Sequence, residues 1–126
     1  MIVVDTSVWV QAGRARDTQT RETLQSLIDA DEVAVALPVR LELASGLGRK
    51  ERGPFLRALS GLPVLVPTED TWRLVESWIG PANDKGDRFA ISDLLIAGLA
   101  NEIGGLVWSL DEDFARLEKL GYVKRY

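Results

Sequence analysis

Carboxylates are the side chains of this sequence best suited to chemistry, and four of them stand at comparable places along it. The sequence contains neither histidine nor cysteine, so histidine-based triads, cysteine nucleophiles and thiolate zinc sites are excluded. Oxygen ligands without nitrogen or sulfur select Mg²⁺ or Mn²⁺, and protein-bound Mg²⁺ commonly also binds substrate phosphate. This chemistry favours a phosphodiester substrate. The four acids that we expect to share one site are Asp5, Glu42, Asp93 and Asp111.

The segments between these acids alternate between short apolar runs and longer amphipathic stretches, which is typical of an α/β fold. We expect strands at 2–4, 33–36, 64–66 and 106–109, and a further edge strand at 122–124. The expected helices are one capped by Thr6 or Ser7, then 18–30, one from 38 that ends near Gly46 or Gly48, 54–59, 69–79 capped by Thr68, 91–103 and 112–120. A basic loop should precede residue 54 and a polar loop should cover 80–88. Strands with near-continuous apolar residues indicate a central parallel sheet with helices on both faces, a three-layer α/β/α sandwich.

This topology would bring the acids together, because sites in parallel sheets lie at the carboxyl ends of the strands. Asp5 directly follows the first strand, and Asp111 comes two residues after the strand at 106–109. Glu42 and Asp93 lie on helices that can face the same edge. Each acid alone is explained more simply, as a helix cap, a helix-dipole charge or a solvated residue. The four together favour a site that binds a cation, because close carboxylates repel one another.

The composition predicts one globular domain over residues 1–126, with 46% hydrophobic and 27% charged residues. A net charge of −4 argues against a protein that coats nucleic acid by bulk electrostatics. The basic segment "GRKERGPFLR" is most simply a solvated loop, but its Arg49, Lys50 and Arg52 are our candidates for RNA contacts. The N-terminal residues lack the features of a signal peptide, so we expect a cytoplasmic location.

The segments that carry the acids also resemble a known family. "IVVDTSVW", "PVRLELASGL", "ISDLLIAGLA" and "LVWSLDEDF" are similar in order and interval to the PIN domain, over nearly the whole chain. The resemblance implies a metal-dependent ribonuclease, and among short single-domain members a VapC-type toxin of a toxin–antitoxin pair. It further implies that Mg²⁺ or Mn²⁺ is bound by Asp5, Asp93 and Asp111, with Glu42 as the fourth catalytic acid. It also implies a VapB-type antitoxin partner and a homodimer.

Polar neighbours of these acids would support the site from outside the ligand set. The four such residues are Thr6, Ser7, Ser109 and Asp113. Ser109 stands where threonine is common in the family, and acids at both Asp111 and Asp113 leave two choices for the last site acid. We assign Asp111 to the metal and Asp113 to a helper role. The competing hypothesis is a PIN-like module that binds RNA or a protein without cutting.

Overall fold

A computed structural model describes residues 1–14 and 16–126, and at its centre these residues form a sheet of four parallel strands. The strands are β1 (Ile2–Val4), β2 (Val33–Ala36), β3 (Val64–Leu65) and β4 (Leu106–Trp108), in the order β3-β2-β1-β4. Ile2 pairs with Val33 on one side and with Leu106 on the other, so the first and last strands are direct neighbours. The parallel sheet and its first two strands are confirmed, while β3 and β4 are each one residue shorter than predicted.

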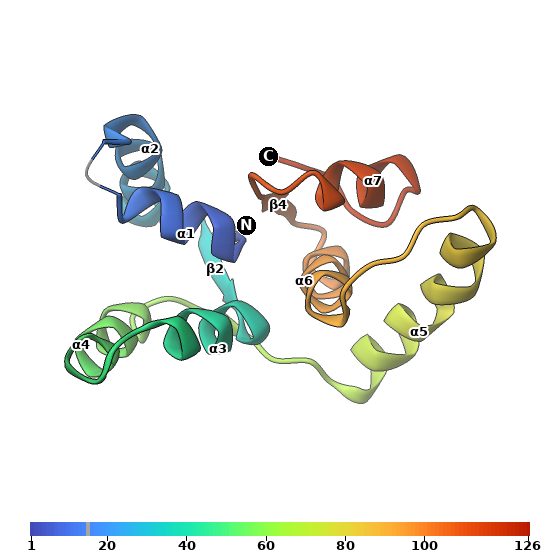
Figure 1. The fold of residues 1–126 in the computed structure, drawn as a ribbon, viewed down its shortest axis with the longest axis horizontal. Helices are drawn as coiled ribbons and strands as arrows, with labels where there is room; N and C mark the ends of the chain where they lie inside the picture. Colours follow the sequence, from blue (N-terminus) through green and yellow to red (C-terminus); the bar gives the residue numbers. More distant parts are fainter. Residues whose placement is uncertain (15) are drawn as a thin grey trace.

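Helices cover both faces of this sheet (Figure 1). They are α1 (Thr6–Ala12), α2 (Thr18–Asp29), α3 (Leu37–Gly46), α4 (Arg49–Leu59), α5 (Glu69–Asp84), α6 (Ile91–Glu102) and α7 (Asp113–Lys119). Because side chains alternate along a strand, Ile2 and Val4 belong to a core cluster with residues of α1 and α2, whereas Val3 belongs to a second cluster with residues of α3 to α7. The predicted three-layer sandwich is therefore confirmed.

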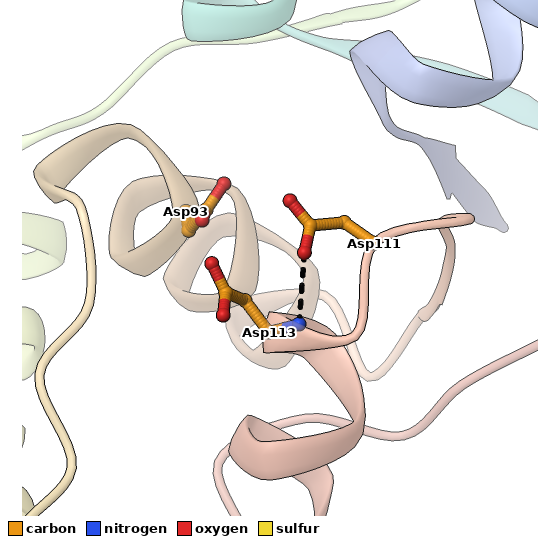
Figure 2. Close-up of side chains that lie close together, drawn as sticks. All are labelled: Asp93, Asp111 and Asp113. Carbon is orange, nitrogen blue, oxygen red and sulfur yellow. Dashed lines mark hydrogen bonds between the residues drawn. The ribbon is translucent and has the colours of Figure 1, made fainter.

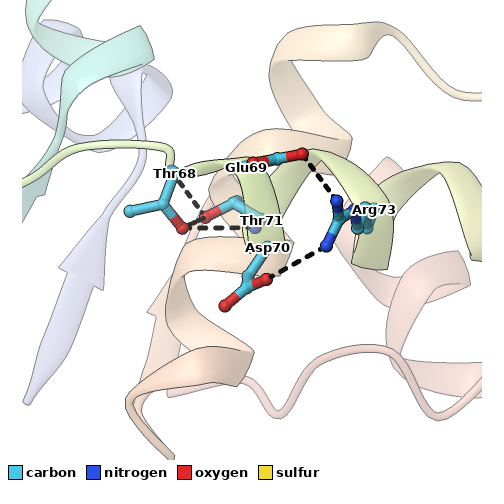
Figure 3. A network of polar contacts seen from close by, with 5 residues as sticks. All are labelled: Thr68, Glu69, Asp70, Thr71 and Arg73. Carbon is cyan, nitrogen blue, oxygen red and sulfur yellow. Dashed lines mark hydrogen bonds and ion pairs between the residues drawn. The ribbon is translucent and has the colours of Figure 1, made fainter.

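The start of α5 shows how local sequence fixes a helix end (Figure 3). The Thr68 side chain accepts a hydrogen bond from the Thr71 backbone N–H, and the Thr71 hydroxyl accepts one from the Thr68 N–H, which completes a capping box. Glu69 and Asp70 lie in the first turn, where the helix dipole favours negative charge, and Arg73 pairs with both. The predicted cap at Thr68 is confirmed.

Two helices extend further than the sequence predicted. The basic segment is not a loop, because α4 begins at Arg49 and continues through Pro54. Likewise α5 continues through Pro81 to Asp84, where a loop was expected. A proline inside a helix removes one backbone hydrogen bond. In α5 that loss is offset by packing, since Trp78 and Ala82, one turn apart, are both buried.

Two predictions about the chain ends were wrong. The cap of α1 is Asp5, not Thr6 or Ser7, because the Asp5 carboxylate accepts the Ser7 N–H. In the described part of the chain no strand forms at 122–124, and a single parallel bridge joins Val107 to Arg125 instead.

Across residues 1–14 and 16–126, no helix combines the length and the apolar character needed to cross a membrane.

Candidate metal centre

Three carboxylates converge at the carboxyl edge of the sheet (Figure 2). One oxygen each from Asp93, Asp111 and Asp113 lie within 4.8 Å of one another. Asp93 is the third residue of α6, Asp111 lies in the turn after β4, and Asp113 is the first residue of α7. We call these three residues the acidic cluster. The structure thus brings Asp93 and Asp111 together as predicted, and adds Asp113, for which the sequence predicted only a helper role.

Burial and neighbouring charges perturb the pKa of Asp93. Its pKa is raised from the ordinary value of 3.8 to about 7, first because burial disfavours the charged carboxylate. Repulsion from other carboxylates raises this pKa further, in the order Asp5, Asp111, Asp113 and Glu42. The other three acids predicted from the sequence are therefore close enough for their charges to affect Asp93. A half-buried acid with a pKa near neutrality is common at functional sites.

Asp5 is held beside the acidic cluster by two serine hydroxyls. Its carboxylate is buried, with 5% of the residue exposed, and its Oδ2 accepts hydrogen bonds of 2.7 Å from both Ser7 and Ser109. Each hydroxyl oxygen in turn accepts a backbone N–H, from Leu110 for Ser7 and from Asp111 for Ser109. These contacts join the end of β1 to the turn after β4. Among the described residues, Asp5 is not part of the set within 4.8 Å, although its charge has the largest effect on Asp93 of any neighbour.

Glu42 lies at the rim of the site. It is exposed on the second turn of α3, and its Oε2 accepts a 3.0 Å hydrogen bond from the Thr6 hydroxyl at the start of α1. Both residues also line a groove of about 440 Å³ between α1, α3 and α4. The rest of that lining is largely apolar, with Trp9, Leu47 and Phe55 among its residues. The acidic site therefore borders a surface suited to apolar side chains.

The three basic candidates lie on α4, and one of them has a structural role. The Arg52 guanidinium donates to the backbone carbonyls of Ala44 and Leu47, at 3.2 and 3.1 Å. These carbonyls belong to the C-terminal end of α3, where a cationic side chain stabilises a helix. Arg49 and Lys50 are exposed in the first turn of α4.

Arg116 is a residue at this site that the sequence did not single out. Its Nη2 donates to Asp113 Oδ1 at 2.6 Å, and its Nη1 donates to Asp87 Oδ1 at 3.1 Å. The spacing of Asp113 and Arg116, three residues apart on one helix, was a signal for the first contact. Asp87 lies 29 residues earlier in the chain, and no local pattern predicts the second.

Comparisons with known proteins show what this chain is similar to. The sequence model of the PIN domain matches residues 2–120. The chain is 31% identical over 119 residues to ribonuclease VapC11 of Mycobacterium tuberculosis (strain ATCC 25618 / H37Rv), covering 90% of this chain and 89% of that protein.

Solved structures share the fold over almost the full length. VapBC2 from Rickettsia felis, bound to a DNA fragment from its promoter, matches with a TM-score of 0.80 at 19% identity and covers 100% of this chain and 98% of that one. VapBC-5 from Mycobacterium tuberculosis, of the VapBC family of toxin–antitoxin systems, matches with a TM-score of 0.67 at 26% identity and covers 98% and 97%.

Proposed function

This chain belongs to the PIN-domain family, and from that premise we propose that it is a metal-dependent endoribonuclease, the toxin of a toxin–antitoxin pair. The observation that carries the proposal is the convergence of Asp93, Asp111 and Asp113 from separate segments, with Asp5 and Glu42 close by. Helix capping alone does not require three carboxylates from separate segments to lie within 4.8 Å of one another. A related protein bears the name ribonuclease VapC11, which supports RNA as the substrate class.

The acidic cluster suits a hard divalent cation. All its donors are carboxylate oxygens, the ligand type that Mg²⁺ and Mn²⁺ prefer. The pKa of Asp93 is raised to about 7 by burial first and then by neighbouring carboxylates, whose negative charge a cation would compensate. A bound divalent ion supplies activation of water and neutralisation of charge on the phosphodiester. We propose Asp93, Asp111 and Asp5 as its ligands and add Asp113 because of its position in the cluster.

The remaining polar groups would orient the reactants. Glu42, at the solvent-exposed rim, would accept a proton from the attacking water and is itself held by Thr6. Ser7 and Ser109 fix the Asp5 carboxylate through Oδ2, and among the described residues Oδ1 receives no hydrogen bond, so it would be available to a ligand. Without histidine in the sequence, carboxylates, lysines and hydroxyls are left for proton transfer, and we propose the carboxylates of this site for that role.

The proposed partner is a VapB-type antitoxin, whose peptide would cover the acidic site. Structural neighbours of this chain are VapBC toxin–antitoxin complexes, which supports such a partner. The apolar groove beside Thr6 and Glu42 offers a surface for its apolar side chains. We further propose a homodimer that acts on RNA in the cytoplasm. The alternative, a binding module that does not cut, has less support because such a module needs no set of four acids around Asp93.

A cleavage assay with defined RNAs tests the proposal. Purified protein should cut RNA in Mg²⁺ or Mn²⁺, and excess EDTA should abolish the cutting. Asp93→Asn, purified in parallel, should be inactive, whereas Asp70→Asn, a first-turn aspartate of α5 outside the cluster, should be fully active. RNA cleavage that persists in EDTA, or in Asp93→Asn, would overturn the mechanism. Binding of RNA without cleavage in any metal would support the non-cleaving module.

A further inference from the structure

Arg116 connects two segments that carry the acidic cluster. On α7 it lies one turn after Asp113 and donates to that carboxylate at 2.6 Å. The same guanidinium reaches three consecutive residues of another segment. It donates to the Asp87 carboxylate at 3.1 Å and to the Arg88 carbonyl at 3.3 Å, and its Cζ lies 4.5 Å from the centre of the Phe89 ring. Arg116 thus joins α7 to the segment that leads into α6.

This connection matters because the segment at 87–90 leads directly into α6. Besides Arg116, it is held by the Asp87 N–H, which donates to the Ala82 carbonyl, and by Phe89, which packs against the core. Residues 87–90 form neither helix nor strand, and they end at Ala90, the N-cap of α6. Ala90 makes no side-chain capping hydrogen bond, so the cap itself does not fix the first turn of α6. Asp93 lies in that first turn. The position of Asp93 relative to Asp113 therefore depends in part on contacts between α7 and the segment before α6, and Arg116 makes three of them.

The hydrogen bonds of Asp113 are divided between its two oxygens. Oδ1 is taken by Arg116, and among the described residues Oδ2 receives no donor. A planar guanidinium with several N–H groups can hold two carboxylates and a carbonyl at once, which a lysine ammonium on a flexible stem does less well. One oxygen of Asp113 is thereby fixed while the other remains open.

We propose that Arg116 is a positioning residue of the cation site, which holds Asp113 and the segment before Asp93 at the spacing that a divalent ion requires. This inference rests on the proposed function, because it assigns a role within the same site. The simpler alternative is an exposed ion pair within one helix, and such pairs contribute little. The contacts to residues 87–89 argue against that alternative, since an ion pair within α7 alone would not involve them.

The test compares Mn²⁺ affinity of full-length variants, measured by electron paramagnetic resonance of free Mn²⁺ without RNA. Arg116→Gln should weaken Mn²⁺ binding by about tenfold or more, in line with residues that orient metal ligands. Arg116→Lys should recover part of the loss. Arg125→Gln is the matched control, because Arg125 also has a side chain 41% exposed and pairs with a carboxylate of α7, Glu118, at 3.1 Å. Its Mn²⁺ affinity should equal that of the parent.

Asp87→Asn provides a second route to the same result. Asp87 lies outside the acidic cluster, yet its loss should also weaken Mn²⁺ binding, and adding it to Arg116→Gln should cause little further loss. If Arg116→Gln impairs folding, Arg116→Lys and Asp87→Asn carry the test. Mn²⁺ affinities of the Arg116 and Asp87 variants within twofold of the parent would overturn the inference and leave the proposed function standing. A parent that binds no Mn²⁺ would overturn both.

Discussion

Replacing Asp93 by asparagine should stabilise the metal-free protein, because it removes a charge that its surroundings oppose. The pKa of Asp93 is raised from 3.8 to about 7 by burial and by neighbouring carboxylates. Between these two pH values the folded state holds a proton that the unfolded state has released. The stability of the metal-free parent should therefore fall as pH rises from about 4 to about 7 and stay low above it. Asparagine, which cannot ionise, should remove this part of the pH dependence.

The size of the effect follows from the two pKa values. Their difference corresponds to about 4 kcal/mol, at about 1.36 kcal/mol for each tenfold change in proton affinity. Asp93 is only half-buried, so solvent screening reduces this figure. We expect the free energy of unfolding of metal-free Asp93→Asn to exceed that of the parent by about 2 kcal/mol at pH 8. For a chain of 126 residues that equals a rise in Tm of roughly 8 °C. At pH 4 Asp93 is protonated in the folded parent, so the free energies of unfolding of parent and variant should differ little.

Bound metal should make the parent more stable than Asp93→Asn, the reverse of their order without metal. A cation that binds only the folded parent adds about 4.1 kcal/mol at a thousandfold excess over its Kd, and Asp93→Asn should lose most of that gain. Thermal melts at pH 5 and pH 8, in EDTA and in Mn²⁺, measure both effects.

Asp70→Asn is the control for these melts. It makes the same change in the first turn of α5, where only the helix dipole and an exposed ion pair are affected, and should shift stability by a few tenths of a kcal/mol. An Asp93→Asn protein that is less stable than the parent at pH 8 in EDTA, and still gains fully from Mn²⁺, would refute the reasoning and make Asp93 a structural charge.

Three other substitutions test the support of the site, its RNA contacts and the packing beneath it. Ser109→Ala removes a hydroxyl that donates to Asp5, so urea unfolding should show a free energy of unfolding lower by about 1–3 kcal/mol, and Ser109→Thr should restore it. An unchanged urea midpoint would mean that the hydroxyl is dispensable. Arg49→Gln combined with Lys50→Gln should lower the slope of log Kd for single-stranded RNA against log salt by about 1.4 in fluorescence anisotropy, and an unchanged slope would make both residues ordinary solvated cations. Gly98→Ala places a Cβ 2.9 Å from a valine methyl carbon of α5 and should cost about 1–3 kcal/mol in thermal unfolding, whereas no loss would show that α5 yields easily.

The parts of the fold that the sequence predicted are those governed by local composition. The strand at 33–36 is apolar throughout because both faces of the sheet are covered, and its bounds were predicted correctly. Asp5 and Asp111 follow neighbouring parallel strands, so topology alone places them at one edge. Capping chemistry at Thr68 identified the start of α5.

The parts that the sequence did not predict depend on contacts between distant segments. Pro81 indicates a helix end, but the buried face of α5 against α6 keeps the helix intact to Asp84. The choice between Asp111 and Asp113 depends on the turn after β4, where the Asp113 N–H donates to Asp111 Oδ1 and both carboxylates face Asp93 (Figure 2). No spacing pattern in the sequence predicts the contacts of Arg116 with residues 87–89.

The most direct test of the cation site is a crystal structure of the protein with Mn²⁺, using anomalous scattering to locate the ion. A peak should lie among the carboxylates of Asp93, Asp111 and Asp113, with the Asp5 carboxylate beside it. The same peak should be absent from crystals of Asp93→Asn grown in the same Mn²⁺ concentration. If the parent shows no peak there at a Mn²⁺ concentration that supports RNA cleavage, or if the ion lies elsewhere on the chain, the acidic cluster is not the metal centre.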